Sequence, residues 1–356
     1  MFITNSILNE RYKLLQLLFR GGMGEVWVAK DIVLDRKVAI KTVSQILLNN
    51  DDSAIKVFQD EAKIGARLLG HPNIVAILDY GIYENDTQEK DYYIVMEYVE
   101  GMNVETFIKS FKSILDEETY YHICLLIAWE MGRAIDYAHK QGILHRDIKP
   151  LNSFISLFGV TKVGDFGLAR IIDAVTRTHT VNDFQSPPYS APEQWKGEKH
   201  VEGTDIYQFG CTLYHLFTGR LIFDKGKMAL MYAHLNEEPQ APKDFCESMP
   251  VELSDKILGM VNKEIEDRTD LWEINDIIAN ELQKSFTLKV TVDKENTELI
   301  DKIVKITDFS SETLVEKGEA QFDFPDSNEV LSEGIQLILN GITSFSIIGK
   351  EQTVQV

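Results

Sequence analysis

Cysteine, basic residues and long apolar runs are all scarce in this chain. Its three cysteines, Cys124, Cys211 and Cys246, lie far apart and lack the spacing of metal ligands. So few cysteines argue against a disulfide framework and are typical of reduced thiols in the cytosol. No apolar run approaches the roughly 20 residues that span a bilayer, and the first residues show no secretory signal. We therefore expect a cytoplasmic protein that does not associate with a membrane.

Basic residues are outnumbered by acidic ones. The 356 residues include 36 lysines and arginines against 56 aspartates and glutamates, which gives a formal net charge of −20. Such a charge repels nucleic acid backbones and anionic lipid surfaces, so we expect no nucleic acid partner. With 44% hydrophobic residues the composition is ordinary for a globular protein. We interpret the charge as a solvated surface that keeps the protein in solution.

The chain does contain short motifs whose side chains suit phosphoryl transfer. His145–Asn152 reads His-Arg-Asp-Ile-Lys-Pro-Leu-Asn and is followed by Asp165-Phe166-Gly167. The first motif offers a carboxylate, an amine and an amide, and the second adds a carboxylate beside a glycine. Moving a γ-phosphoryl group requires a group that orients the attacking hydroxyl, a cation near the phosphate, and oxygen ligands for Mg²⁺. In this order the two motifs are highly specific.

Three further motifs stand at the expected places around this pair. Arg20–Val26 is a glycine-rich turn between two strand patterns, Val38–Lys41 ends an apolar run with a lysine, and Ala191–Glu193 reads Ala-Pro-Glu. With these motifs the chain resembles the eukaryotic-type protein kinases, and among them the bacterial serine/threonine kinases, to which Asp205–Tyr214 is also similar. The resemblance covers roughly residues 12–284.

The resemblance implies a fold of the α+β class with two lobes. A small β-rich N-lobe is expected over about 12–96 and a larger helical C-lobe over about 100–284. The residue patterns agree with this, because apolar periodicity predicts strands over 12–45, 74–78 and 92–96 and helices over 52–69 and 117–141.

Residues 285–356 lie beyond the resemblance. Apolar and polar residues alternate from Phe286 to Val292 and again over 343–347, which predicts strands, and 298–306 and 328–340 have the pattern of amphipathic helices. We expect a small α/β module that answers to an unidentified partner or signal. The alternative, a disordered acidic tail, is disfavoured by the apolar content.

The resemblance assigns catalytic roles to four residues. Asp147 would orient the substrate hydroxyl and accept its proton, and Lys149 would neutralise charge that develops on the transferred group. Asn152 and Asp165 would supply oxygen ligands to the metal. The implied cofactors are ATP and Mg²⁺, with Mn²⁺ as a substitute, and the implied substrates are proteins with serine or threonine hydroxyls.

The resemblance also implies a nucleotide site. Lys41 would hold the α- and β-phosphates, with Glu61 as its ion-pair partner. The base would bind backbone groups near Glu97 and Val99, although such contacts make these side chains only weakly diagnostic. The remaining predicted site residues are the glycines Gly21, Gly22 and Gly24, which let the backbone approach phosphates, and Val26, Ala39 and Met96 at the adenine pocket, which are equally well explained as ordinary core residues.

Regulation is expected in the segment that follows Asp165. In the family, an arginine at the position of Arg146 often pairs with an anion on this segment. Thr176, Thr178 and Thr180 are therefore candidate autophosphorylation sites, with ordinary loop threonines as the alternative. Ser186 is expected to contact Asp147 and Lys149. Glu193 and Arg268 should form an internal brace, and Asp205 should support the catalytic loop.

Two departures from the family pattern support a second hypothesis. Phe19 occupies the first glycine position, and Gln185 stands where the family has a glycine. They favour a pseudokinase that holds a nucleotide and acts through residues 285–356, whereas the complete set of Lys41, Asp147, Asn152 and Asp165 favours an active enzyme. A small-molecule kinase is disfavoured by the Ala-Pro-Glu motif. Family members often pair through their N-lobes, so a homodimer is a further possibility.

Overall fold

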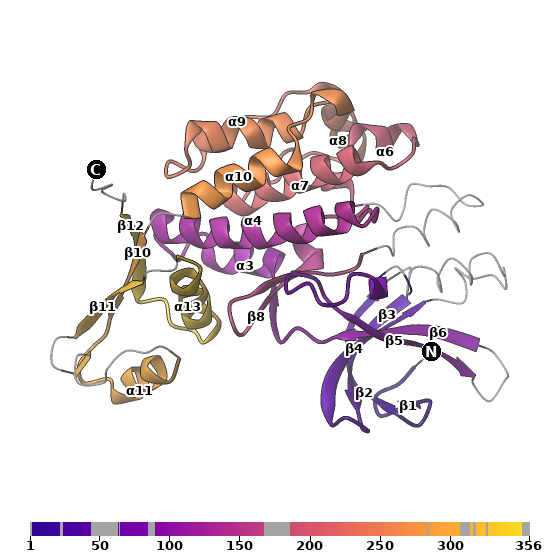
Figure 1. The fold of residues 1–356 in the computed structure, drawn as a ribbon, viewed down its shortest axis with the longest axis horizontal. Helices are drawn as coiled ribbons and strands as arrows, with labels where there is room; N and C mark the ends of the chain where they lie inside the picture. Colours follow the sequence, from indigo (N-terminus) through magenta and orange to yellow (C-terminus); the bar gives the residue numbers. More distant parts are fainter. Residues whose placement is uncertain are drawn as a thin grey trace. The chain divides into compact units, whose positions relative to one another are not determined.

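The chain forms two compact units in a computed structural model (Figure 1). The first unit takes Met1–Val99, Ala138–Asp147 and Val163–Ser186, and the second takes Glu100–Tyr137, Ile148–Lys162 and Pro187–Val356. The structure describes residues 2–21, 24–43, 63, 65–84, 90–166, 186–282, 285–306, 314–315, 318–324 and 327–350. The first unit is mainly strands and the second mainly helices, which confirms the predicted α+β kinase fold.

The first unit is built on an antiparallel sheet of six strands in the order β1-β2-β3-β4-β6-β5. The strands are β1 (Ile7–Leu8), β2 (Tyr12–Gly21), β3 (Gly24–Asp31), β4 (Arg36–Val43), β5 (Ile77–Glu84) and β6 (Lys90–Glu97). Within this sheet β4 lies between β3 and β6, so its backbone is paired on both sides. A strand paired on both sides is a rigid support for a functional side chain.

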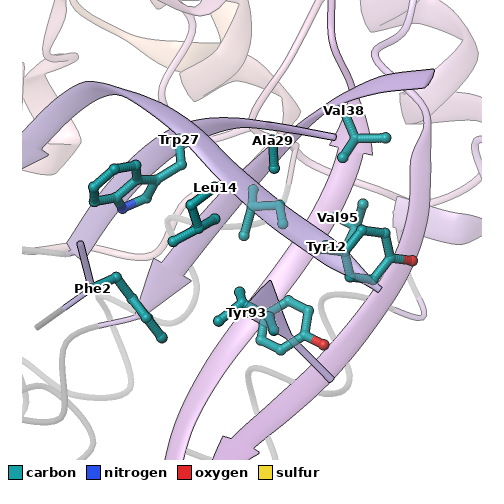
Figure 2. Packing of buried hydrophobic residues seen from close by; sticks show 10 residues of the cluster. Phe2, Tyr12, Leu14, Trp27, Ala29, Val38, Tyr93 and Val95 are labelled. Carbon is teal, nitrogen blue, oxygen red and sulfur yellow. The ribbon is translucent and has the colours of Figure 1, made fainter. Parts of the chain in front are cut away.

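The core of this unit lies on one face of the sheet, where side chains from several strands converge (Figure 2). Alternate residues of a strand point to the same face, so Trp27 and Ala29 of β3 both enter the core. Each large aliphatic or aromatic side chain buried in this way contributes roughly 1.5–3 kcal/mol. The cluster consists of Phe2, Leu8, Tyr12, Leu14, Trp27, Ala29, Val38, Ile40, Tyr93 and Val95.

The second unit is organised around α7 (Glu202–Thr218), whose side chains are buried from Thr204 to Thr218. The helix ends at Gly219, which adopts φ +72° and donates its N–H to the His215 carbonyl at 2.9 Å. A glycine suits this left-handed position. Further helices of the described residues before the C-terminal sheet are α3 (Val104–Phe111), α4 (Glu117–Lys140), α6 (Pro192–Lys196), α8 (Lys227–Asn236), α9 (Val251–Met260) and α10 (Leu271–Leu282). A small sheet contains β7 (Gly101–Asn103), β8 (Ser153–Ser156) and β9 (Thr161–Val163).

The C-terminal residues form a three-stranded antiparallel sheet with helices. Its strands are β10 (Ser285–Thr291), β11 (Glu319–Phe324) and β12 (Phe345–Lys350) in the order β11-β10-β12, accompanied by α11 (Thr297–Ile306) and α13 (Ser327–Leu339). These elements contact α4: the Ile347 N–H donates to Thr119 Oγ1 at 2.8 Å, and the rings of His122 and Phe286 are 4.7 Å apart. The sequence predicted β10, β12 and both helices but not β11.

Two predicted elements differ from the structure at their ends. The strand expected over 74–78 begins only at Ile77, because Ile74 instead forms an isolated bridge with Val163. In the helix expected over 52–69, the described residues are helical only up to Ala66 and then form a turn. Among the residues that the structure describes, no helix has both the length and the apolar character needed to cross a membrane.

Candidate active site

Lys41 and Asp165 form an ion pair in the first unit. Lys41 stands on β4 opposite Val26 of β3 and Ile94 of β6. Its Nζ lies 3.0 Å from Asp165 Oδ2, and the two side chains are 18% and 27% exposed. The cation predicted to hold phosphates therefore lies beside a carboxylate predicted to bind metal, and both remain accessible. Glu61, the predicted partner of Lys41, lies outside the described residues.

The glycine-rich turn joins β2 to β3, and its base is held by Glu25. The Glu25 carboxylate accepts from Arg20 Nε at 2.8 Å and from Trp27 Nε1 at 2.9 Å. At the end of the hairpin Gly21 pairs with Gly24, whose φ of +141° suits glycine. Phe19 lies on β2 with 60% of its surface exposed. Gly22 lies outside the described residues.

The residues predicted to surround the base lie on β3, β4 and β6. Ala39 is buried and is paired with Met96 across the sheet. At the last residue of β6, the Glu97 N–H donates to the Ala76 carbonyl at 2.9 Å, and the Glu97 carboxylate accepts from the Ala76 N–H at 3.3 Å. The segment leading to Val99 is thus fixed at its start by Glu97.

Asp147 has a hydroxyl against its carboxylate. Ser186 Oγ donates to Asp147 Oδ1 at 2.9 Å, so the predicted contact between these residues is confirmed. The Asp147 N–H donates to His145 Nδ1 at 3.3 Å, while His145 Nε2 lies 2.8 Å from the Gly164 carbonyl. These partners require the neutral histidine with its proton on Nε2. His145 thereby connects Asp147 to the residue before Asp165.

The backbone has unusual torsion angles at the residue before Asp147 and at Asp165 itself. Arg146 adopts φ +73° and Asp165 adopts φ +61°, in the left-handed region that residues other than glycine seldom occupy. The Phe166 ring is buried and lies 4.6 Å from the His145 ring. Such strain persists where surrounding contacts impose it, and it is common at functional sites.

Lys149 and Asn152 belong to the second unit. Lys149 precedes a 3₁₀ turn over Pro150–Asn152, and the Asn152 N–H donates to the Lys149 carbonyl at 3.0 Å. Asn152 is 7% exposed. The turn therefore fixes the spacing between the amine and the amide.

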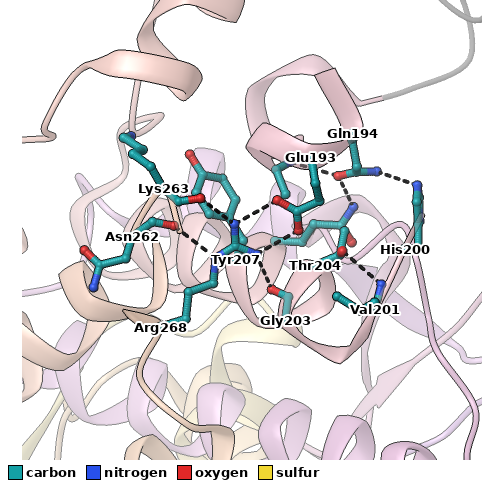
Figure 3. A network of polar contacts seen from close by, with 12 residues as sticks. Glu193, Gln194, His200, Val201, Gly203, Thr204, Tyr207, Asn262, Lys263 and Arg268 are labelled. Atoms are coloured by element: carbon teal, nitrogen blue, oxygen red, sulfur yellow. Dashed lines mark hydrogen bonds and ion pairs between the residues drawn. The ribbon is translucent and has the colours of Figure 1, made fainter. Parts of the chain in front are cut away.

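The predicted brace between Glu193 and Arg268 is confirmed in the second unit (Figure 3). Arg268 Nη1 and Nη2 each donate to one Glu193 oxygen at 2.8 Å, and the side chains are 1% and 3% exposed. Burial acts to raise the pKa of Glu193, but the Arg268 guanidinium outweighs it and holds the pKa below its ordinary value. Arg268 also donates to the carbonyls of Gly203, Asn262 and Lys263.

Sequence reasoning missed two buried amides near the catalytic motif. The Ile148 N–H donates to Gln208 Oε1, and Gln208 Nε2 donates to Gln194 Oε1, each at 2.9 Å. We expected Asp205 to support this loop, and that carboxylate is fully buried on the same helix. A glutamine within an apolar helix pattern is a weak signal, because most core positions are apolar. The candidate phosphorylation sites Thr176, Thr178 and Thr180, together with Gln185, lie outside the described residues.

Comparison with known proteins finds one family and many relatives. Residues 12–304 match the family described as "Protein kinase domain". The chain is 39% identical over 256 residues to serine/threonine-protein kinase PrkC of Bacillus subtilis, which covers 71% of this chain and 38% of that protein. It is 33% identical over 341 residues to probable serine/threonine-protein kinase PknB of Lactococcus lactis, covering 94% of this chain and 52% of that protein. The chain thus spans about half the length of such relatives or less.

Solved structures show the same fold. A crystal structure of the PknI kinase domain of Mycobacterium tuberculosis is similar with a TM-score of 0.59 and 24% sequence identity, covering 79% of this chain and 98% of that domain. At this identity the likeness concerns the fold alone. It agrees with the division into a strand-rich unit and a helical unit.

Proposed function

The chain belongs to the protein kinase family, and from that premise we propose that it transfers the γ-phosphoryl group of ATP to serine and threonine hydroxyls of protein substrates. Its bacterial relatives carry the name of serine/threonine-protein kinases. Because the chain spans only part of those relatives, its activity and its substrates are proposed here from its own residues.

The observation that carries the proposal is the hydroxyl seated on Asp147. A substrate serine must place its Oγ within hydrogen-bond distance of the group that takes its proton. Ser186 Oγ donates to Asp147 Oδ1 at 2.9 Å, which is the distance a substrate hydroxyl would need. Since His145 holds the Asp147 N–H, this carboxylate is attached to a constrained backbone. In the proposed reaction Asp147 orients the attacking hydroxyl and accepts its proton.

The ion pair in the first unit suits a nucleotide with a divalent cation. Carboxylate and amide oxygens are the protein ligands that Mg²⁺ accepts, while phosphates and water complete its shell. Asp165 offers such an oxygen, and Lys41 Nζ, 3.0 Å from Asp165, provides a positive charge for the phosphates. The family resemblance assigns the second such oxygen to Asn152. Bound Mg²⁺ would neutralise negative charge on the phosphates. Mn²⁺ prefers similar ligands and is proposed as its substitute.

The second unit contributes the amine of Lys149. A cation two residues after the proton acceptor can offset negative charge on the transferred group without leaving the loop. The 3₁₀ turn that follows Lys149 limits the freedom of its backbone. We assign Lys149 to this electrostatic role.

Regulation and partners are proposed on the sequence motifs. Arg146, in its left-handed conformation, would pair with phosphate on Thr176, Thr178 or Thr180. Residues 285–356 would receive a partner or signal, and their contact with α4 ties them to the second unit. A homodimer and a cytoplasmic location stay predictions from the sequence.

Labelled ATP tests the proposed function. Purified protein incubated with γ-labelled ATP and Mg²⁺ should label itself and a generic acceptor such as dephosphorylated casein. Asp147→Asn keeps the shape of the side chain and removes the proton acceptor, so labelling should fall at least about 10²-fold. Wild-type labelling no higher than that of Asp147→Asn would overturn the proposal and favour the pseudokinase. The complete set of catalytic side chains and the named relatives disfavour that alternative.

A further inference from the structure

The backbone N–H of Ile148 is held by a side chain of helix α7. It donates to Gln208 Oε1 at 2.9 Å. Thr212 Oγ1 lies 3.4 Å from the Ile148 carbonyl, but its single proton is donated to the nearer Gln208 carbonyl at 2.8 Å. Gln208 and Thr212 are four residues apart on the helix and therefore share one face. Gln208 is 3% exposed and Thr212 is fully buried, so water does not compete for these bonds. Ile148 stands between Asp147 and Lys149.

The same glutamine continues the connection to α6. Gln208 Nε2 donates to Gln194 Oε1 at 2.9 Å, and the Ala191 N–H donates to that oxygen at 2.8 Å. Gln208 thus accepts with one end of its amide and donates with the other, so a flip of the amide would break both bonds. Gln194 is 6% exposed. Two side-chain amides therefore link the first residues of α6 to the backbone of Ile148.

Asp147, the residue before Ile148, has its own side-chain contact within the first unit. Ser186 Oγ donates to the Asp147 carboxylate at 2.9 Å. The glutamine connection, which lies within the second unit, therefore reaches Asp147 only through the peptide bond that joins Asp147 to Ile148.

We infer that Gln208, acting with Gln194, is a positioning residue for phosphoryl transfer. By fixing the backbone of Ile148 it sets the directions in which the side chains of Asp147 and Lys149 leave the loop. This inference rests on the proposed function. A misplacement of about 1 Å in reacting groups can cost about 10²-fold in rate. Gln208→Met should therefore lower kcat by about 10- to 10²-fold and leave the KM for ATP unchanged, because Gln208 contacts the loop rather than the predicted nucleotide site.

The test compares four variants by kcat, KM for ATP and thermal unfolding, with casein as the acceptor. Gln208→Met removes both bonds at similar volume. Gln208→Glu keeps an oxygen that accepts from the Ile148 N–H but offers no amide donor to Gln194. Gln194→Met keeps the Ile148 bond and removes the other two. The matched control is Thr218→Val, which deletes a buried hydroxyl on α7 that bonds the Tyr214 carbonyl at 2.6 Å and has no bond to the loop.

The inference expects a graded loss of kcat. Gln208→Met should be the slowest, Gln208→Glu and Gln194→Met should recover part of the rate, and Thr218→Val should keep the wild-type kcat even though it unfolds at a lower temperature. A kcat for Gln208→Met equal to that of Thr218→Val, or a change confined to the KM for ATP, would overturn it. Should Gln208→Met fail to fold, a wild-type kcat in both Gln208→Glu and Gln194→Met would overturn it equally.

Hydrogen exchange separates this inference from the proposed function. The Ile148 amide, read at residue resolution by mass spectrometry, should exchange faster in Gln208→Met than in wild type and should be unchanged in Thr218→Val. This readout needs no catalysis, so a wild-type protein that transfers no phosphate would refute the proposed function while exchange still tests the bond. Equal Ile148 exchange in Gln208→Met and wild type would refute the positioning role.

Discussion

The two units of this chain offer two ion pairs for comparison, Glu193–Arg268 and Lys41–Asp165, which differ in burial and in geometry. In the second unit Arg268 grips Glu193 with two bonds of 2.8 Å, and both side chains are almost fully buried. In the first unit Lys41 reaches Asp165 with one bond of 3.0 Å, and both side chains are partly exposed. The Glu193–Arg268 pair is closed to solvent, and the Lys41–Asp165 pair is accessible to it.

The difference in burial suggests different roles: the Glu193–Arg268 pair stabilises the fold, and the Lys41–Asp165 pair is available for the proposed reaction. A buried charge that loses its partner stays buried and unpaired, which makes the Glu193–Arg268 pair costly to break. A pair that reaches solvent gains little from its own attraction. Under the proposed function, Lys41 and Asp165 would therefore give up their mutual contact for phosphate and metal at small cost in free energy. The Glu193–Arg268 pair is thus a permanent contact, while the Lys41–Asp165 pair keeps its charges available.

The largest effect is expected for Arg268→Met, which tests whether burial makes the Glu193–Arg268 pair important for stability. The substitution leaves the Glu193 carboxylate buried without its cation, and we expect the free energy of unfolding to fall by about 3–5 kcal/mol. The control is Lys109→Met, which removes an exposed pair with Glu105 four residues away on α3 and should cost about 0.3–0.5 kcal/mol. Urea unfolding measures both. A similar loss for the two variants would show that burial does not distinguish these pairs.

The second prediction concerns the accessible pair. Lys41→Met should lower the rate of phosphate transfer by about 10²–10³-fold, because a preorganised cation at the phosphates is lost. The free energy of unfolding should change by at most about 1 kcal/mol, since the pair is partly exposed. Initial rates and urea unfolding check both parts. Lys30→Met, at a surface pair with Asp35 in the same unit, should keep its activity. A large loss of stability in Lys41→Met would make this pair structural too.

The sequence predicted residues whose chemistry has a recognisable spacing. Lys41, Asp147 and Asp165 stood out because phosphoryl transfer needs a cation, a carboxylate and a metal ligand, and the family motifs place them in that chain order. The Glu193–Arg268 pair and the contact of Ser186 with Asp147 were predicted from family motifs and are found. These contacts could be predicted because each needs a particular residue type at a particular position in a motif.

What the sequence could not predict depends on partners far away in the chain. Gln208 lies 60 residues from Ile148, and nothing in its neighbours indicates that its amide will meet that backbone N–H. The start of β5 shifted to Ile77 because Ile74 is engaged by Val163. In both cases a tertiary contact decided the local structure. Strand β11 is different, because polar and apolar residues alternate over Glu319–Phe324 and this signal was overlooked.

A buried histidine in the second unit, His234, predicts that acid lowers the free energy of unfolding. Burial, with a contribution from the Lys263 charge, lowers the pKa of His234 from 6.5 to about 3. In the unfolded chain His234 takes up a proton as the pH falls through 6.5, whereas in the folded chain it stays neutral until the pH is much lower. The free energy of unfolding therefore falls as the pH drops below 6.5. Between pH 7 and 5 the loss should reach about 2 kcal/mol.

The variant His234→Gln tests this acid sensitivity. Glutamine does not titrate and can still accept from the Tyr207 hydroxyl, which lies 2.9 Å from His234 Nδ1. Urea unfolding at pH 7, 6 and 5 should show a flatter dependence of the free energy of unfolding on pH than in wild type. Parallel curves for His234→Gln and wild type would contradict the expected titration.

The smallest effect is expected where the C-terminal sheet meets α4. It tests whether the C-terminal sheet unfolds together with the buried helices around α7, which we call the closed region. Thr119 Oγ1 is fully buried and accepts from the Ile347 N–H at 2.8 Å. Thr119→Val keeps the shape but leaves that N–H buried without a partner, which should cost about 1–2 kcal/mol. Thr119→Ser retains the hydroxyl and should lose less. If residues 285–350 belong to the closed region, Thr119→Val lowers the midpoint of a single unfolding transition. A separate early transition for the C-terminal sheet would instead confine the closed region to the helices around α7.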